Sequence, residues 1–368
     1  MIRTSGILIV LMLVFAACSS DNGDTGESGT DTFDRGAMLA NWADNIIAPA
    51  FENFTSSTQD LENKTNVFVE DPSEAKLAAL RVAYEKAYLD FQTVSMFEIG
   101  KAEELNYRNF LNTYPVSVTA MEEKINSGGY NLSLPSTYSQ QGFPALDYLI
   151  NGVGETNAEI VAVYSSANYK NYLKSVSERI NALTKEVNTS WQGAYRDIFV
   201  DNTSSSSTGS VDRFTNDFVM YYEKFLRTGK IGFPAGAFTG EPLPQNVEAV
   251  YSDDLSRKLY IKSVESVRDF FNGKHFSASQ TGPSYKQYLD HLSFTKAGEN
   301  LSNLINAQFN AILAQAAELN PNLKTQVESN NEKMLLAFDE LQKAVVLLKV
   351  DMLQALSISV DYVDSDGD

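Results

Sequence analysis

Hydrophobic residues recur along most of the chain at intervals of three and four, the spacing that places them on one face of an α-helix. One such stripe comprises Leu77, Leu80, Tyr84, Tyr88, Phe91 and Val94. Comparable stripes cover residues 169–187, 211–225, 301–312 and 335–356. Polar and apolar residues do not alternate over any useful length, as they do in a half-buried strand. The pattern therefore predicts an all-α protein built from helix bundles.

Polar, glycine-rich and proline-rich segments divide this helical pattern. Asp71, Pro72 and Glu74 supply an N-cap, a proline at the first helical position and an acidic third position, which predicts a helix start. Residues 202–210 are a Ser-rich loop that separates an N-terminal bundle (33–201) from a C-terminal bundle (211–368). Residues 229–244 contain four Gly and three Pro. We predict that they form a second irregular segment, which either has a function or covers a bundle end.

The N-terminus has the features of a targeting signal. Arg3 precedes an apolar run over residues 7–14, and Ala16 and Ala17 precede Cys18. This arrangement resembles a bacterial lipoprotein signal. The apolar run is shorter than the roughly 20 residues that a membrane-spanning helix needs. We predict a signal peptide at 1–17, lipidation of Cys18 and a flexible acidic tether at 18–32. The alternatives are an ordinary secretory signal with an incidental cysteine, and an apolar N-terminus that is retained.

Composition excludes two classes of function. The chain has 29 Lys and Arg against 47 Asp and Glu, a formal charge of −18, which argues against binding nucleic acid. With two His and one Cys, the usual four-ligand Cys/His zinc site cannot form. His275 and His291 lack metal-site spacing and are interpreted as surface or core residues. Trp42 and Trp191 adjoin polar runs, so each is either a core residue or part of an interface or ligand wall.

Several segments resemble the imelysin-like family. Residues 141–150, Gln-Gly-Phe-Pro-Ala-Leu-Asp-Tyr-Leu-Ile, are similar to its signature region, where a G-x-H-x-x-E motif leads into an apolar helix. Residues 108–115 are similar to the segment that precedes the motif. Further similarities to the second half of the family lie at 229–236, 247–252, 270–273 and 360–368. The order of these segments extends the resemblance from about residue 34 to the end of the chain.

The resemblance implies two similar four-helix-bundle domains, a groove between them as the functional site, and an association with iron uptake. It also implies an outer-membrane lipoprotein in a Gram-negative cell envelope, facing the periplasm or the surface. Its partners would be the membrane, through Cys18, and receptor or transporter components of iron uptake. The resemblance leaves iron or haem open as a ligand and names no cofactor.

The family was once classed as metallopeptidases, because His and Glu at i and i+3 share one helix face. This chain departs from the motif, with Pro144 at the His position and Asp147 at the Glu position. We interpret Pro144 as a first helical residue, and Asp147 either as a first-turn carboxylate or as part of the groove lining. We therefore expect a non-enzymatic binding protein. The alternatives are a metal-dependent peptidase and a surface adhesin or adaptor.

The predicted ligand-binding residues come from both halves of the chain. Gly142, Pro144 and Asp147 are expected to line the groove from the first half. Arg227, Lys230, Glu248 and Tyr251 are expected to face them from the second half. Arg227 and Lys230 would either pair with Asp147 or receive an anionic ligand; otherwise they are ordinary surface cations.

Overall fold

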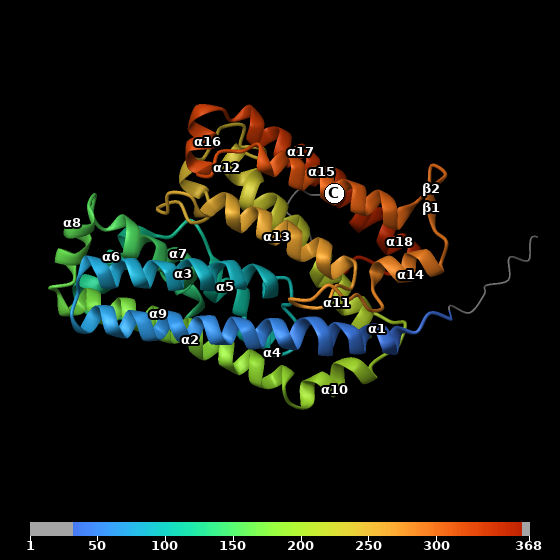
Figure 1. Ribbon diagram of the computed structural model, residues 1–368, viewed down its shortest axis with the longest axis horizontal. Coiled ribbons are helices and arrows are strands. Elements are labelled where there is room, and N and C mark those ends of the chain that lie inside the picture. Colours follow the sequence, from blue (N-terminus) through green and yellow to red (C-terminus); the bar gives the residue numbers. More distant parts are fainter. Residues whose placement is uncertain (1–31, 363–368) are drawn as a thin grey trace, which may run out of the picture. The chain divides into compact units, whose positions relative to one another are not determined.

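A computed structural model describes residues 32–362 of the chain (Figure 1). Helices account for most of these residues, which confirms the predicted all-α class. The predicted signal peptide, Cys18, nearly all of the tether and the last six residues lie outside the described part. No helix within the described part is long and apolar enough to cross a membrane.

The N-terminal half has three long helical rods and a series of short helices; η denotes a 3-10 or π-helical segment. Its elements are α1 (Arg35–Trp42), η1 (Ala43–Ile47), α2 (Ala48–Glu70), α3 (Glu74–Val94), α4 (Lys101–Leu105), α5 (Tyr107–Asn112), α6 (Val118–Ser127), η2 (Pro135–Gln140), α7 (Gly142–Asp147), η3 (Tyr148–Gly152), α8 (Asn157–Val163), α9 (Ala167–Trp191) and α10 (Ala194–Asp201). Helix α2 packs against both α3 and α9, and α7 packs against α9 and α5.

The C-terminal half begins after the loop that the Ser-rich sequence predicted. Its elements are α11 (Ser210–Met220), η4 (Tyr221–Gly232), α12 (Phe233–Ala235), η5 (Pro244–Asn246), α13 (Leu255–Phe271), α14 (Tyr285–His291), β1 (Thr295–Lys296), β2 (Glu299–Asn300), α15 (Leu301–Ala317), α16 (Leu323–Ser329), α17 (Glu332–Val345), η6 (Val346–Met352) and α18 (Leu353–Ala355). Within residues 32–362, the strands β1 and β2 pair as an antiparallel hairpin and form the only sheet.

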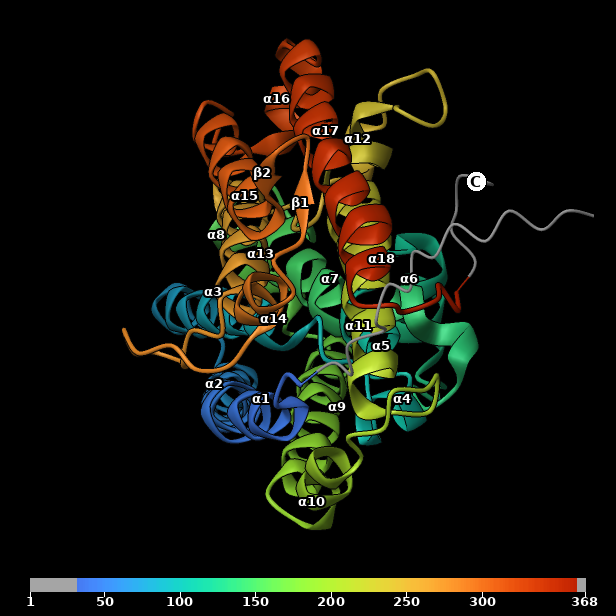
Figure 2. The same cartoon turned by 90° about the vertical axis from the view of Figure 1, so that its right-hand side faces the viewer.

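Helices α3 and α13 join the two halves. They pack against each other, while α13 also packs against α15, and α17 packs against α15 and η4. Figures 1 and 2 show the resulting layers, with α2 and α9 on one side of α3 and α15 and α17 beyond α13. The contact between α3 and α13 therefore places side chains of both halves next to each other.

The helical pattern continues further than predicted at residues 229–244. Helix α11 runs without a break through η4 and α12 to Ala235, so the prediction of an irregular segment is wrong for its first seven residues. Gly232 explains the difference, because a Cβ there would lie 2.7 Å from the Phe238 ring and 3.0 Å from the Phe338 ring. The glycine permits close packing and does not mark a loop.

The start of α3 differs from the predicted N-cap by two residues. Ser73, and not Asp71, is the N-cap, and its hydroxyl accepts a hydrogen bond from the backbone N–H of Lys76. Asp71 forms an ion pair with the Lys76 ammonium, 2.9 Å away. Both residue types suit an N-cap, so the sequence predicted a helix start at this point of the chain but placed it two residues too early.

Both tryptophans are buried core residues. Trp42 contacts Phe214, Phe270 and Tyr285, with ring centroids 5.4, 5.1 and 4.7 Å away. Trp191 packs against Tyr195 and Phe199. Because Trp42 lies at the end of α1 and its three neighbours lie in the C-terminal half, it belongs to a core shared by both halves.

Candidate functional site

The motif region forms α7, which starts two residues earlier than predicted. Gln141 is the N-cap, so Pro144 is the third residue of α7 and Asp147 is its last. The interpretation of Pro144 as the first helical residue, with Asp147 in the first turn, is therefore wrong. The helix starts at Gly142, whose φ of +75° is accessible mainly to glycine. A Cβ at this position would lie 2.2 Å from the backbone oxygen of Leu111.

Asp147 is buried at the boundary between the two halves. Its carboxylate accepts hydrogen bonds from the Tyr251 backbone N–H (2.8 Å), the Ser252 hydroxyl (2.6 Å) and the Asn151 amide (3.0 Å). Burial raises the pKa of Asp147, and the hydrogen bonds from Ser252 and Tyr251 oppose that rise. Asp147 thus connects α7 to the segment that precedes α13.

Lys230 and Glu248 form a second buried connection. The Lys230 ammonium pairs with the Glu248 carboxylate and donates to the Gln92 side chain at 2.9 Å. The Asn112 amide donates to Glu248 at 2.7 Å. Burial lowers the pKa of Lys230, and the charge of Glu248 opposes that effect. We call Gln92, Asn112, Asp147, Lys230, Glu248 and Ser252 the polar seam.

The polar seam is closed by its own hydrogen bonds. Lys230 and Glu248 are 3% and 2% exposed, and Asp147 is 1% exposed. Next to Lys230 lies a void of about 20 Å³, bordered also by Gln92 and Asn112. That volume suits a water molecule and is far below the few hundred Å³ of an organic ligand site. The seam joins residues of both halves by hydrogen bonds and leaves an organic ligand no room there.

Arg227 points away from the polar seam. It is 1% exposed and lies between the rings of Phe238 and Phe338, where its guanidinium donates to the Gln342 side chain. The described donors to Asp147 include neither Arg227 nor Lys230, so the predicted ion pair with Asp147 does not form. Residues three apart share a face in an α-helix, but η4 has the wider turns of a π-helix. Arg227 and Lys230 therefore diverge.

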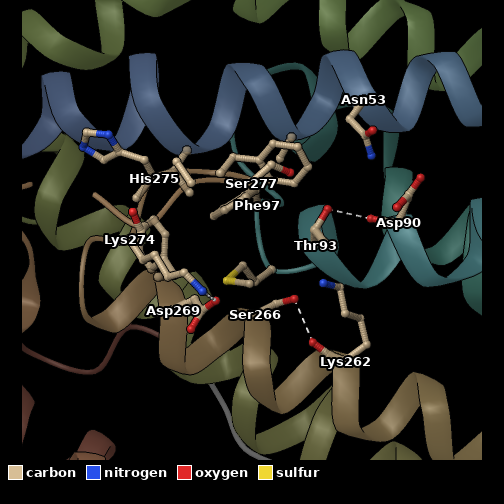
Figure 3. Close-up of a pocket in the computed structure, with 17 residues that line it drawn as sticks. Asn53, Asp90, Thr93, Phe97, Lys262, Ser266, Asp269, Lys274, His275 and Ser277 are labelled. Carbon is tan, nitrogen blue, oxygen red and sulfur yellow. Dashed lines mark hydrogen bonds and ion pairs between the residues drawn. The ribbon is translucent and has the colours of Figure 1, made fainter. Parts of the chain in front are cut away.

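A larger cavity lies on another side of the contact between the halves. Its volume is about 540 Å³, within the range of small-molecule sites. Three helical rods line it, namely η1 with α2, α3, and α13, and each contributes residues from one of its faces. These residues are Ile46, Ala50 and Asn53 on η1 and α2, Asp90 and Thr93 on α3, and Lys262, Ser266 and Asp269 on α13. We call this space the α2–α3–α13 cavity (Figure 3).

The loop after α13 completes the wall of the cavity with residues 274–279. It is attached to the N-terminal half, because the Phe276 N–H donates to the Asn45 backbone oxygen at 2.8 Å. The Asn41 amide also donates to the Pro283 backbone oxygen at 3.1 Å. His275 lies on this loop, at the end of the cavity away from Asn53 (Figure 3). His291 is exposed and does not line it.

The carboxylates that line the cavity have partners. Asp90 pairs with Lys86 at 2.5 Å and accepts a hydrogen bond from Ser57. Asp269 pairs with Lys274 at 2.8 Å. In contrast, no hydrogen bond or ion pair of the Lys262 ammonium is found within residues 32–362. Figure 3 shows the Lys262 side chain extending from α13 across the cavity toward Thr93.

A third polar cluster lies at the end of α3, around Arg108. The Arg108 guanidinium pairs with Asp217 at 3.2 Å and lies 4.5 Å from the Phe225 ring centre. The Glu98 carboxylate accepts the Arg108 backbone N–H at 3.0 and 3.1 Å. Burial, with a smaller contribution from the charge of Asp217, raises the pKa of Glu98 from 4.5 to about 7.

This raised pKa predicts how stability depends on pH. The folded protein binds the Glu98 proton more tightly than the unfolded chain, so the contribution is complete below pH 4.5 and is lost as pH rises through 7. One pKa unit corresponds to about 1.4 kcal/mol, and partial exposure reduces the effect. We expect the free energy of unfolding to fall by roughly 2 kcal/mol over this range, as measured by urea unfolding. Glu98→Gln is expected to flatten this decline, whereas Glu328→Gln, at an exposed position on α16, is expected to retain it.

Most of the residues that line the α2–α3–α13 cavity belong to no motif in the sequence. Apart from His275, none of the cavity residues was considered as a site. Their one sequence signal is the helical spacing of polar residues such as Lys262, Ser266 and Asp269, and this spacing is also typical of a solvent-facing helix surface.

Comparisons with known proteins agree with the fold. A family model described as imelysin (peptidase M75) matches residues 47–350. The structure is similar to that of a protein from Parabacteroides distasonis ATCC 8503 named as an iron-regulated protein A precursor. That similarity has a TM-score of 0.72 and 17% sequence identity, and covers 89% of this chain and 97% of that chain.

A second similar structure is that of an imelysin-like protein from Psychrobacter arcticum 273-4. Its TM-score is 0.68 with 16% identity, and the similarity again covers 89% of this chain and 97% of the other. No curated protein sequence matches the chain.

Proposed function

Because the chain belongs to the imelysin family, we propose that it is a non-enzymatic binding protein of iron acquisition that holds its cargo in the α2–α3–α13 cavity. The observation that carries this proposal is a cavity of about 540 Å³ between helices of both halves, with the partnerless Lys262 ammonium reaching into it. Clefts with this volume and a few polar groups are typical ligand sites. The polar seam, by contrast, has its donors and acceptors matched to each other.

The chemistry of the motif region supports binding over hydrolysis. A catalytic zinc site needs about three protein ligands and an open position for water. Pro144 has no donor side chain, and the Asp147 carboxylate is occupied by three hydrogen bonds. Within residues 32–362, His, Cys, Asp and Glu do not gather in any group of three or more that could hold a metal ion. The described residues therefore do not fit the metal that a peptidase of this kind requires.

The link to iron and to the cell envelope rests on two further observations. One of the similar structures is that of a protein named as iron-regulated. The N-terminal sequence resembles a lipoprotein signal that ends at Cys18. We place the protein at the membrane of a Gram-negative cell envelope through lipidated Cys18, where it passes cargo to receptor or transporter components of iron uptake. In this proposal the halves 33–201 and 211–368 act as two domains that enclose the cargo.

Filling the cavity tests the proposal. We expect the purified protein to bind at least one of three iron sources, namely ferric citrate with excess citrate, haemin, or a neutral ferric hydroxamate. Ser266→Phe is expected to weaken that binding tenfold or more, because the ring occupies the cavity. The Ser266 hydroxyl donates only to the Lys262 carbonyl one turn back, so its loss breaks no contact between helices. Calorimetric titration gives the affinities.

Ser329→Phe is the matched control. Its hydroxyl makes the same contact, to the Thr325 carbonyl one turn back, but Ser329 is exposed on α16 and does not line the cavity. Binding that Ser266→Phe leaves unchanged would show that the cargo site lies elsewhere. Cleavage of a peptide library by the purified protein, abolished by EDTA, would support the metallopeptidase alternative instead.

A further inference from the structure

The charges around the α2–α3–α13 cavity do not cancel. Asp90 pairs with Lys86, and Asp269 pairs with both Lys274 and Arg268. Both carboxylates that line the cavity are therefore neutralised by their own partners, and Lys262 is the lining cation without an ionic partner in residues 32–362. Glu265 lies on the same helix as Lys262, but it does not line the cavity and no ion pair joins the two side chains. The Lys262 ammonium is thus an uncompensated positive charge at the cavity, although the chain as a whole has a formal charge of −18.

The long-range repulsion from that net charge does not prevent an anion from binding here. At physiological ionic strength, interactions between exposed charges are screened beyond about 8 Å. A carboxylate within hydrogen-bond distance of Lys262 interacts mainly with that ammonium and its neighbours. Hydrogen bonds between two charged groups are about twice as strong as those between neutral groups. The partnerless Lys262 ammonium therefore favours a ligand that brings a negatively charged acceptor to it.

The same cavity is unsuited to an uncoordinated iron ion. Iron needs several oxygen, nitrogen or sulfur ligands, and no group of three or more His, Cys, Asp or Glu side chains that could hold a metal ion is found in residues 32–362. A partnerless ammonium would also repel a bare cation. Iron that enters the cavity must therefore arrive with its own ligands, and the complex must be neutral or negative.

We propose that the cargo of the cavity is a small anionic iron chelate that carries free carboxylates, and that Lys262 binds one of them. This inference rests on the proposed function and specifies the ligand class. The amide of Asn53 also lines the cavity and supplies a further donor to oxygen-rich ligands, whereas the Thr93 hydroxyl already donates to the Asp90 backbone oxygen at 2.7 Å. Met96, Phe97 and Phe270 line the floor of the cavity and make it apolar. This floor is suited to pack against the carbon skeleton of the chelate.

The test compares the charge of the ligand with the charge at residue 262. The probes are citrate alone, ferric citrate with excess citrate, and a neutral ferric hydroxamate, titrated calorimetrically into the full mature protein. We expect ferric citrate to bind and the neutral complex to bind at least tenfold more weakly. Lys262→Gln is expected to weaken the binding of ferric citrate tenfold or more, and Lys262→Arg to preserve it. Citrate alone shows whether the carboxylates suffice without iron.

Lys258→Gln is the matched control, because Lys258 lies one turn away on α13 and pairs with Glu85 and Asp254 outside the cavity. It is expected to leave affinity unchanged. A neutral chelate that binds, is excluded by Ser266→Phe and ignores Lys262→Gln would overturn the ligand class while leaving the proposed function intact. If none of the iron sources binds, or if Ser266→Phe has no effect, the proposed function fails and this inference fails with it.

Discussion

Lys230→Met is expected to destabilise the protein by about 3–5 kcal/mol, because it leaves the Glu248 carboxylate buried without its cation. Lys230 and Glu248 are 3% and 2% exposed, so bulk solvent does not solvate the carboxylate that is left without its cation. The Gln92 side chain also loses the Lys230 ammonium as a donor. Urea unfolding followed by circular dichroism measures this change in the free energy of unfolding.

Two comparisons separate the buried charge from a general effect of the substitution. The double variant Lys230→Met/Glu248→Gln removes both charges and keeps an acceptor for the Asn112 amide, so we expect it to recover most of the lost stability. Lys258→Gln breaks two ion pairs between exposed side chains, with Glu85 and Asp254, and should cost about 1 kcal/mol or less. If Lys230→Met costs no more than Lys258→Gln, the polar seam does not hold the two halves together.

The helical stripes were predictable because each depends on residues within a few turns of one another. The stripes over 77–94 and 169–187 correspond to α3 and α9. Helices α2 and α13 carried no identified stripe, because small polar residues occupy some of their buried positions. Thr65 and Ser263 are both fully buried and donate to the carbonyl one turn back, which satisfies their hydroxyls inside the core.

The candidate site was less predictable, because it depends on how separate helices meet. Lys230 and Glu248 were predicted to face the motif region, but their mutual pairing depends on the wide turns of η4, which local spacing does not reveal. Asn53, Thr93 and Lys262 come from three helices far apart in the sequence. Each is a polar residue on an amphipathic helix, and only the packing of α3 against α13 turns these positions into a cavity wall.

Gly142→Ala is expected to destabilise the protein by about 3 kcal/mol or more, because the new Cβ meets two independent obstacles. The φ of Gly142 is +75°, where an L-residue is strained. The Cβ would also lie 2.2 Å from the Leu111 oxygen and 2.7 Å from the Phe110 oxygen, both backbone atoms of α5 that cannot rotate away. Helix α7 must therefore shift away from α5, and Asp147 at its end moves with it. Thermal and urea unfolding measure the loss.

Gly240→Ala separates the two obstacles. Gly240 has nearly the same φ, +77°, but no atom lies within 4 Å of the position that its Cβ would take. This variant has the strain without the collision, so we expect a cost of about 1 kcal/mol. The difference between the two variants measures how closely α7 packs against α5. Equal costs would mean that strain alone requires glycine at the start of the motif, and that the contact with Leu111 does not fix the position of Asp147.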